Sequence, residues 1–188
     1  MIHTKQYLIE TVSIADSIKV EDIEAMVKEL VALRERRGRL FLIGLGGSAA
    51  NCSHAVNDFR KLCGIEAYAP TDNVAELTAR MNDEGMPTIF DSDFWTEKDA
   101  LFILSVGGGT VMVSLPLVRS IGRASLLGMR ILGIVGKDGG ATKAEGDCVI
   151  VVPTVNAERV TPHTEGWQSV ILHCIVSHPD LQIRKTKW

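Results

Sequence analysis

The first part of the chain carries apolar residues at helical spacing. Between residues 23 and 33 they recur every three or four positions, which is the pattern of an amphipathic helix. Three arginines end this segment and Gly38 follows them. Cations stabilise the C-terminal end of a helix, and glycine commonly terminates one. The pattern therefore predicts two helices over residues 4–37.

After Gly38 the pattern changes to short, continuous apolar runs that end in glycine or a polar turn. Runs without alternation are typical of strands buried on both faces, as in a parallel sheet. Segments with helical spacing separate them, so the order predicts an α/β fold, a doubly wound three-layer sandwich with a five-stranded parallel sheet. The predicted strands are residues 40–43, 65–69 (the weakest), 100–104, 131–135 and 149–152, and the predicted helices are residues 48–62, 74–82, 114–127 and 162–177.

Length and composition fit one globular domain. The 188 residues suit a single core, with residues 1–37 as a helical segment ahead of an α/β sandwich over residues 38–188. The net charge of −3 gives no basic excess for nucleic-acid binding, and no apolar run approaches the length of a membrane span. The polar N-terminus is unlike a signal peptide. Four cysteines without a CxxC pair predict a reducing cytoplasm and no disulfide scaffold.

The first predicted strand runs into the loop GLGGSA at residues 44–49. Together with Glu66 downstream, this loop formally matches the fingerprint of a dinucleotide-binding domain. We do not favour NAD, because Glu66 precedes the second strand's apolar residues and because 37 residues lie ahead of the predicted sandwich. The loop still indicates a ligand site, because glycines permit close approach of a ligand and a helix N-terminus favours an anion such as phosphate.

Two pairs of histidines and acids stand on predicted helices. His54 and Asp58 are four residues apart, and Glu165 and His173 are eight apart, so each pair lies near one side of its helix. On spacing alone, the favoured interpretation is that the acids are solvated and the histidines are half-buried without a ligand, because such pairs are common on helix surfaces. Nitrogen and carboxylate donors of this kind can also bind zinc.

The start of the last helix is predicted from Thr161-Pro162, with Thr161 as the cap and Pro162 in the first position. This start places Glu165 in the first turn, where its charge suits the helix dipole. We expect His163, near the same end, to be exposed, and His178 to end the helix before Pro179.

Taken together, these motifs resemble the sugar isomerase (SIS) domain, and more narrowly the phosphoheptose isomerases. That family interconverts sedoheptulose 7-phosphate and D-glycero-D-manno-heptose 7-phosphate. The resemblance implies the SIS fold, an aldose–ketose isomerase (an intramolecular oxidoreductase), and a cytoplasmic homotetramer whose sites draw residues from neighbouring subunits. The motifs that carry it are Gly46-Gly47-Ser48-Ala49-Ala50 followed by His54, Thr71-Asp72-Asn73, Leu77-Thr78-Ala79, Asn82-Asp83, the segment GIVGKDGG at residues 133–140, and Val152-Pro153-Thr154.

The resemblance also implies one zinc ion per subunit. In the family a histidine and a glutamate stand at the positions of His54 and Asp58, and a glutamine and a histidine stand at those of Glu165 and His173. These four bind zinc, and the glutamate and the last histidine act as acid and base. We therefore predict His54, Asp58, Glu165 and His173 as metal ligands, with Asp58 and His173 catalytic. Because Glu165 adds a carboxylate, either it or Asp58 could be the base.

The third predicted strand ends before Ser105, and the loop Val106-Gly107-Gly108-Gly109-Thr110 follows. Relatives have a hydroxyl-rich loop here that binds phosphate, and this chain lacks the hydroxyls at Val106 and Gly107. A triple glycine can offer backbone N–H groups instead, although it is also an ordinary flexible turn. We expect Gly108→Val to weaken phosphate binding without unfolding the protein. The predicted substrate-binding residues are Gly46, Gly47, Ser48, Asn82, Asp83, Ser105, Gly107, Ser114 and Glu165.

The altered glycine loop also leaves a second function open. Leu45 stands where relatives have an asparagine that touches the substrate, which favours a SIS module that binds a sugar phosphate or a protein without turnover. The two histidine–acid pairs favour the isomerase, because an adaptor does not need them. An isomerase of another sugar phosphate is a third alternative.

Overall fold

The computed structural model describes residues 2–186, and it begins with two helices as predicted. Helix α1 spans His3–Ser17 and α2 spans Val20–Glu35. Gly38 ends the second helix by donating its N–H to the Leu33 carbonyl, at 3.0 Å. A Cβ at Gly38 would lie 1.9 Å from the carbonyl oxygen of Lys98, so only glycine fits there.

Five parallel strands form the sheet, in the order β2-β1-β3-β4-β5. They are β1 (Leu40–Ile43), β2 (Ala67–Tyr68), β3 (Ala100–Ser105), β4 (Arg130–Val135) and β5 (Cys148–Val151). The predicted α/β sandwich with a five-stranded parallel sheet is therefore confirmed. The strand at the β2 edge is shorter than the predicted residues 65–69, because only two of its residues pair with β1.

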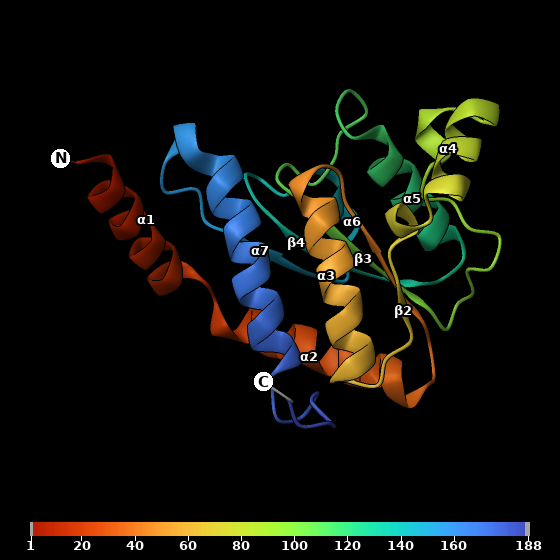
Figure 1. Ribbon diagram of the computed structural model, residues 1–188, viewed down its shortest axis with the longest axis horizontal. Coiled ribbons are helices and arrows are strands. Elements are labelled where there is room, and N and C mark those ends of the chain that lie inside the picture. The colour runs from red at the N-terminus through yellow and green to blue at the C-terminus, as the bar shows by residue number, and fades with distance from the viewer. Residues whose placement is uncertain (1, 187–188) are drawn as a thin grey trace.

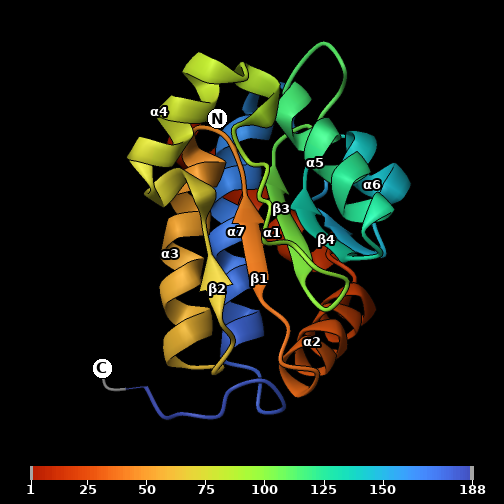
Figure 2. The same cartoon turned by 90° about the vertical axis from the view of Figure 1, so that its right-hand side faces the viewer.

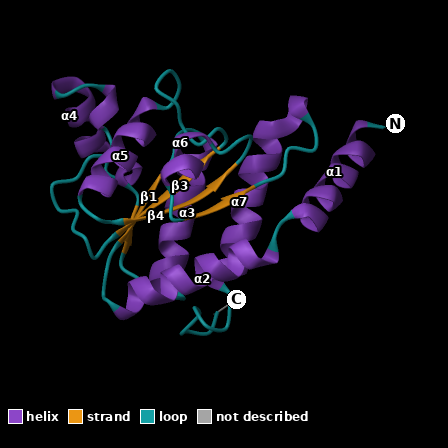
Figure 3. Ribbon diagram, turned by 180° about the vertical axis from the view of Figure 1, so that it is seen from behind, coloured by secondary structure: helices purple, strands orange, loops and turns teal. Residues whose placement is uncertain are grey.

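Helices cover both faces of the sheet (Figures 1 and 2). Helices α2, α3 (Gly47–Lys61) and α7 (Val160–Val176) cover one face, while α5 (Leu115–Leu126) and α6 (Gly140–Glu145) cover the other. Helix α4 (Val74–Asp83) packs near the short turn at Met86–Thr88. The view from behind shows α1 at the edge of the molecule beside α7 (Figure 3). Within residues 2–186, no helix combines the length and the apolarity needed to cross a bilayer.

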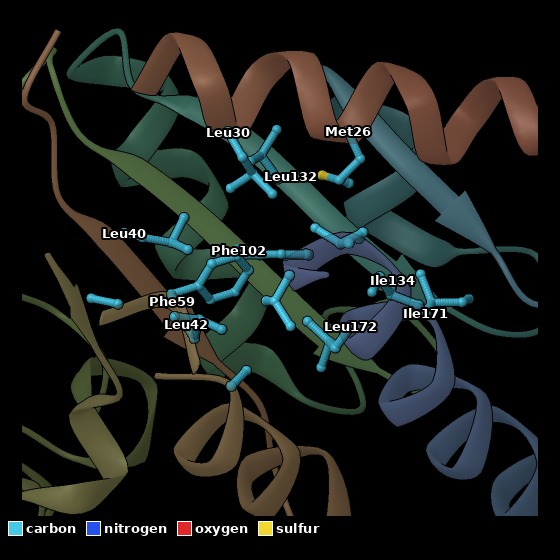
Figure 4. Packing of buried hydrophobic residues seen from close by; sticks show 14 of the residues in the cluster. Met26, Leu30, Leu40, Leu42, Phe59, Phe102, Leu132, Ile134, Ile171 and Leu172 are labelled. Atoms are coloured by element: carbon cyan, nitrogen blue, oxygen red, sulfur yellow. The ribbon is translucent and has the colours of Figure 1, made fainter. Parts of the chain in front are cut away.

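Each face of the sheet has its own apolar core. The larger core joins the strands to α2, α3 and α7, and Figure 4 shows Phe102 and Leu132 of the sheet among Met26, Phe59 and Leu172 of these helices. A smaller core lies under α5. The strands are buried on both sides, which is why their sequences are continuously apolar rather than alternating.

Helix α7 begins earlier than predicted. A short turn at Ala157–Arg159, in which Asn156 accepts a hydrogen bond from the Glu158 N–H, leads straight into the helix at Val160. Thr161 is therefore inside the helix rather than its cap, and Glu165 lies in the second turn. Ser114 does stand immediately before α5, but its side chain makes no capping hydrogen bond.

A buried polar cluster fastens α1 to the start of α7. Glu10 is 4% exposed and accepts hydrogen bonds from Arg159 at 2.8 and 2.9 Å, from Asn156 at 2.8 Å and from Gln6 at 3.1 Å. Nε2 of His163 lies 2.9 Å from the same carboxylate, and its ring stacks on Tyr7. The expectation that His163 is exposed is wrong, because partners on α1, distant in sequence, bury it.

We expect Glu10→Ala to lower the Tm by several degrees at pH 7, because it leaves Arg159 and His163 without their shared acceptor. The hydrogen bonds from Arg159, and then those from Asn156 and His163, hold the pKa of Glu10 well below its usual value. Its contribution to stability is therefore complete above the unfolded pKa, about 4.3, and is lost as the pH falls through the lower folded pKa.

Thermal unfolding of wild type and Glu10→Ala between pH 3 and pH 7 tests this. The difference in Tm should be largest near pH 7 and should shrink toward pH 3. Asp16→Ala, an exposed acid on the same helix, is the matched control and should leave Tm nearly unchanged. A difference that stays constant over the whole range would contradict the proposed role of the ionised carboxylate.

Candidate active site

The sheet topology places a cavity at the carboxyl ends of the strands. The strand order reverses between the neighbouring strands β1 and β3, because the chain continues from β1 to β2 on one side and from β3 to β4 and β5 on the other. Folds of this kind bind their ligands at this switch point. A cavity of about 480 Å³ lies there, between the loops that follow β1, β3 and β4. Its lining residues are Leu45, Ser48, Ser105, Val106, Gly107, Gly109, Thr110, Val113, Ser114, Lys137, Asp138 and Thr161.

Four predicted substrate-binding residues line this cavity, namely Ser48, Ser105, Gly107 and Ser114. Gly46 and Gly47 belong to the loop and helix start that enter it beside Ser48. Asn82 and Asp83 do not reach it, because they lie exposed at the end of α4, where the amide of Asn82 donates to Asp83 at 2.7 Å.

The glycine loop packs on the start of α6. The carbonyls of Gly108 and Gly109 accept hydrogen bonds from the N–H groups of Thr142 and Ala141, at 3.0 and 2.9 Å. The N–H of Gly108 donates to the Ser105 hydroxyl at 3.0 Å. Within residues 2–186, the N–H groups of Gly107 and Gly109 make no hydrogen bond, so these two amides are the ones open to a ligand.

The expectation that Gly108→Val leaves the fold intact is wrong. Gly108 has a φ of +68°, and a Cβ there would lie 1.8 Å from the carbonyl oxygen of Gly139. Any side chain would therefore push the loop away from α6. Gly107 has room instead, since a Cβ there would meet only the Lys137 side chain, at 4.0 Å.

Three of the four predicted metal ligands come together between α3 and α7. Nε2 of His54 lies 3.1 Å from Nε2 of His173 and 3.2 Å from Oδ2 of Asp58. Nε2 of His173 lies 3.8 Å from the same carboxylate oxygen. The two histidines are exposed and Asp58 is buried, so the group is open to solvent on one side. With their donor atoms within 4.8 Å of one another, these side chains could hold a metal ion.

Glu165 is not part of this group. Its carboxylate lies over the N-terminus of α3, where a Cβ on Gly47 would come within 2.6 Å of it. Glu165 and His173 are eight residues apart, about 12 Å along the helix axis, so the two side chains need not converge. The positive end of the α3 dipole favours a carboxylate at this place. The role of Glu165 as a ligand therefore stays a prediction.

Buried amides hold α3 and α7 in register. The side-chain amide of Asn51 donates to the Glu165 carbonyl and to Oε1 of Gln168, both at 2.9 Å. Gln168, fully buried, donates to the Ser48 hydroxyl at 3.2 Å, and Ser169 donates to Oδ1 of Asn51 at 2.9 Å. These contacts set where His54 and Asp58 stand relative to His173.

Sequence reasoning missed several residues of the site. Lys137, Asp138 and Thr161 line the cavity, and Asn51 and Gln168 support the helices beside it. A signal for Lys137 and Asp138 was present, because they follow a buried strand after only one residue, Gly136, and so lie near its carboxyl end. Asn51 and Gln168 are polar residues on otherwise apolar helix faces, which signals a buried hydrogen bond without naming the partner.

Solved structures identify the fold. The phosphoheptose isomerase of Neisseria gonorrhoeae superposes with a TM-score of 0.78 at 21% identity, over 92% of this chain and 94% of that one. The sugar isomerase domain of the RpiR transcription factor from Sphaerobacter thermophilus gives a TM-score of 0.63 at 16% identity, over 94% and 89% of the two chains. The fold is therefore the SIS fold of the sugar isomerases.

Curated relatives narrow this class. The phosphoheptose isomerase of Clostridium acetobutylicum is 30% identical over 155 residues, covering 77% of this chain and 76% of the relative. That of Helicobacter pylori strain P12 is 26% identical over 188 residues, covering 93% and 94%. No family model matches the chain. The chain belongs to the phosphoheptose isomerase family, which makes it a sugar-phosphate isomerase.

Proposed function

We propose that this protein interconverts sedoheptulose 7-phosphate and D-glycero-D-manno-heptose 7-phosphate, with a bound divalent cation. The observation that carries the proposal is the group formed by His54, Asp58 and His173, in a chain of the phosphoheptose isomerase family. A binding module would not need a buried carboxylate that faces two imidazoles across two helices.

The reaction moves one proton between neighbouring carbons. A base removes a proton from C1 of the ketose while O2 gains a proton, which gives the enediol. An acid then delivers a proton to C2 while the O1 hydroxyl loses its proton, which gives the aldehyde. Asp58 and His173 are suited to this exchange, because their Oδ2 and Nε2 atoms lie 3.8 Å apart and so can face the two carbons of one substrate. The variants Asp58→Asn, His173→Asn and Glu165→Gln distinguish the roles of these two residues and test Glu165 as the alternative base.

The donors of this group suit zinc. Two imidazole nitrogens and one carboxylate oxygen are donors of the kind that zinc binds. The Nε2 atoms of His54 and His173 face each other at 3.1 Å, a hydrogen-bond distance, so a small movement of the two rings would let both nitrogens bind one cation. When bound, zinc would supply Lewis-acid polarisation of the substrate oxygens. The proposal is one ion per chain, held by His54, Asp58 and His173, with Glu165 as the predicted fourth ligand.

The two ends of the substrate engage different parts of the protein. In the open-chain sugar, the reacting carbons C1 and C2 and the phosphate on C7 lie at opposite ends of the molecule. The phosphate would take the free amides of Gly107 and Gly109 in the cavity, while C1 and C2 would reach the α3–α7 group. Ser48, in the first turn of α3, lines the cavity and belongs to the helix that carries His54 and Asp58.

We also propose that the protein forms a homotetramer, which its resemblance to the phosphoheptose isomerases implies. Asn82 and Asp83 are exposed and do not reach the cavity of their own chain, so they would serve the cavity of a neighbouring one. The exposed apolar residues Leu8 and Val12 of α1 provide a face for such packing. Sedimentation of the purified protein measures the number of chains in the assembly.

Exchange with solvent tests the reaction directly. Incubation of the metal-loaded protein with sedoheptulose 7-phosphate in deuterium oxide should give the aldoheptose phosphate with deuterium at C2. Fructose 6-phosphate and ribulose 5-phosphate serve as comparison substrates, since exchange into one of them alone would indicate another sugar-phosphate isomerase. Exchange into none would contradict the enzyme and leave a binding module.

A further inference from the structure

We infer that Lys137, in the loop between β4 and α6, is the cation that binds the substrate's phosphate and sets its register in the cavity. The inference rests on the proposed function and assigns a residue beyond the amides of the glycine loop. Lys137 is the one cation among the residues that line the cavity. A phosphate dianion that loses hydroxyl partners at Val106 and Gly107 needs a compensating charge.

The position of Lys137 matches this role. Its side chain extends over Gly107, and its Cδ would lie 4.0 Å from a Cβ built on that glycine. The Lys137 side chain therefore lies beside the loop whose Gly107 and Gly109 amides are open to a ligand. In the part of the chain that the structure describes, Lys137 has no ion-pair partner, so its charge is available.

Backbone strain at the cavity is a second observation. Three non-glycine residues of the described chain have a positive φ, and two of them, Ser114 at +63° and Lys137 at +52°, line this cavity. The third, Arg37, follows the end of α2, where such a conformation is common. Left-handed backbone at a lysine is unfavourable, and strain of this kind gathers where a fold clamps a ligand. In this conformation the Lys137 side chain lies against the glycine loop, within 4.0 Å of a Cβ built on Gly107.

The neighbouring acid does not neutralise Lys137. Oδ1 of Asp138 accepts a hydrogen bond from the Gly140 N–H at 3.2 Å, which turns this carboxylate toward its own loop. The carboxylate contributes instead to the turn that leads into α6. The cavity therefore presents one exposed cation and two open amides on the side of the glycine loop.

Lys137→Met removes the charge and keeps most of the side chain. We expect the KM for sedoheptulose 7-phosphate to rise about ten- to a hundredfold, with a much smaller change in kcat. Lys137→Arg should retain most of the affinity. Lys137→Asn is a second charge-removing variant, since asparagine tolerates the left-handed backbone. The matched control is Lys98→Met. Lys98 is exposed and lies just before the start of β3, at the end of the strands opposite to the cavity.

Calorimetric titration with inorganic phosphate makes this test independent of turnover. Phosphate should bind the wild type and Lys98→Met alike, and should bind Lys137→Met and Lys137→Asn about ten- to a hundredfold more weakly. Unchanged phosphate affinity and unchanged KM in both Lys137 variants would overturn the inference while leaving the isomerase intact. If the wild type shows no isomerisation but the phosphate affinity still falls in these variants, the proposed function fails and the role of Lys137 stands.

Discussion

Asp58→Asn and His173→Asn are each expected to lower kcat for sedoheptulose 7-phosphate by about a hundred- to ten-thousandfold. Asparagine at position 58 keeps the shape of the buried side chain but cannot accept a proton as a base. At position 173, it removes the imidazole that lies 3.8 Å from the Asp58 carboxylate. The sugar-phosphate affinity should fall far less, because the cavity that binds the phosphate is unchanged.

Steady-state kinetics and calorimetric titration of the same preparations separate the two effects. His178→Asn, just beyond the C-terminal end of α7, is the matched control and should keep wild-type kcat. Glu165→Gln completes the set. If only Glu165→Gln abolished turnover, the base would be Glu165, and Asp58 would keep at most a role as a metal ligand.

Each chain purified without chelator or affinity-tag metal is expected to contain close to one equivalent of zinc. The reason is the convergence of two imidazole nitrogens and one carboxylate oxygen within 4.8 Å. His173→Ala should lose most of this metal, because it removes one of three converging donors. Elemental analysis of the purified protein measures the content, and thermal unfolding shows whether the variant remains folded.

His178→Ala again serves as the control, since its imidazole faces Glu24 instead of the group, and it should keep the metal. Glu165→Ala tests the fourth ligand separately. Loss of metal there would mean that the carboxylate leaves Gly47 and joins the group when the ion binds. Full retention of metal in His173→Ala would remove this histidine from the site.

The strands were predictable because burial on both faces leaves a continuous apolar signal. Residues 40–43 were located to the residue, whereas the predicted second strand was too long, since pairing at the β2 edge ends after two residues. Helix α6 was missed because six residues that begin with glycine are too short to show a helical period. The start of α7 shifted because the turn capped by Asn156 precedes it.

The site was predictable where residues lie at or just after the carboxyl end of a strand, as Ser105 and Gly107 do, and where a short spacing on one helix brings two side chains together. His54 and Asp58 are neighbours by spacing, and the resemblance supplied His173 from a second helix. The orientation of Glu165 over Gly47 depends on how α7 packs against α3, and no local pattern contains that information. The burial of His163 likewise depends on Tyr7 and Glu10, which are distant in sequence.

The polar bridge between α3 and α7 also affects how this protein can be engineered. Replacing both Asn51 and Gln168 by leucine would remove their mutual hydrogen bond and leave the hydroxyls of Ser48 and Ser169 without these partners, while the two leucines add apolar contacts that offset part of the loss. A variant of this kind that remains folded has lost the polar contacts that fix the register of its two helices. Screens that report only folding would then retain proteins in which His54 and His173 no longer meet, and catalytic precision would be lost without any sign of unfolding.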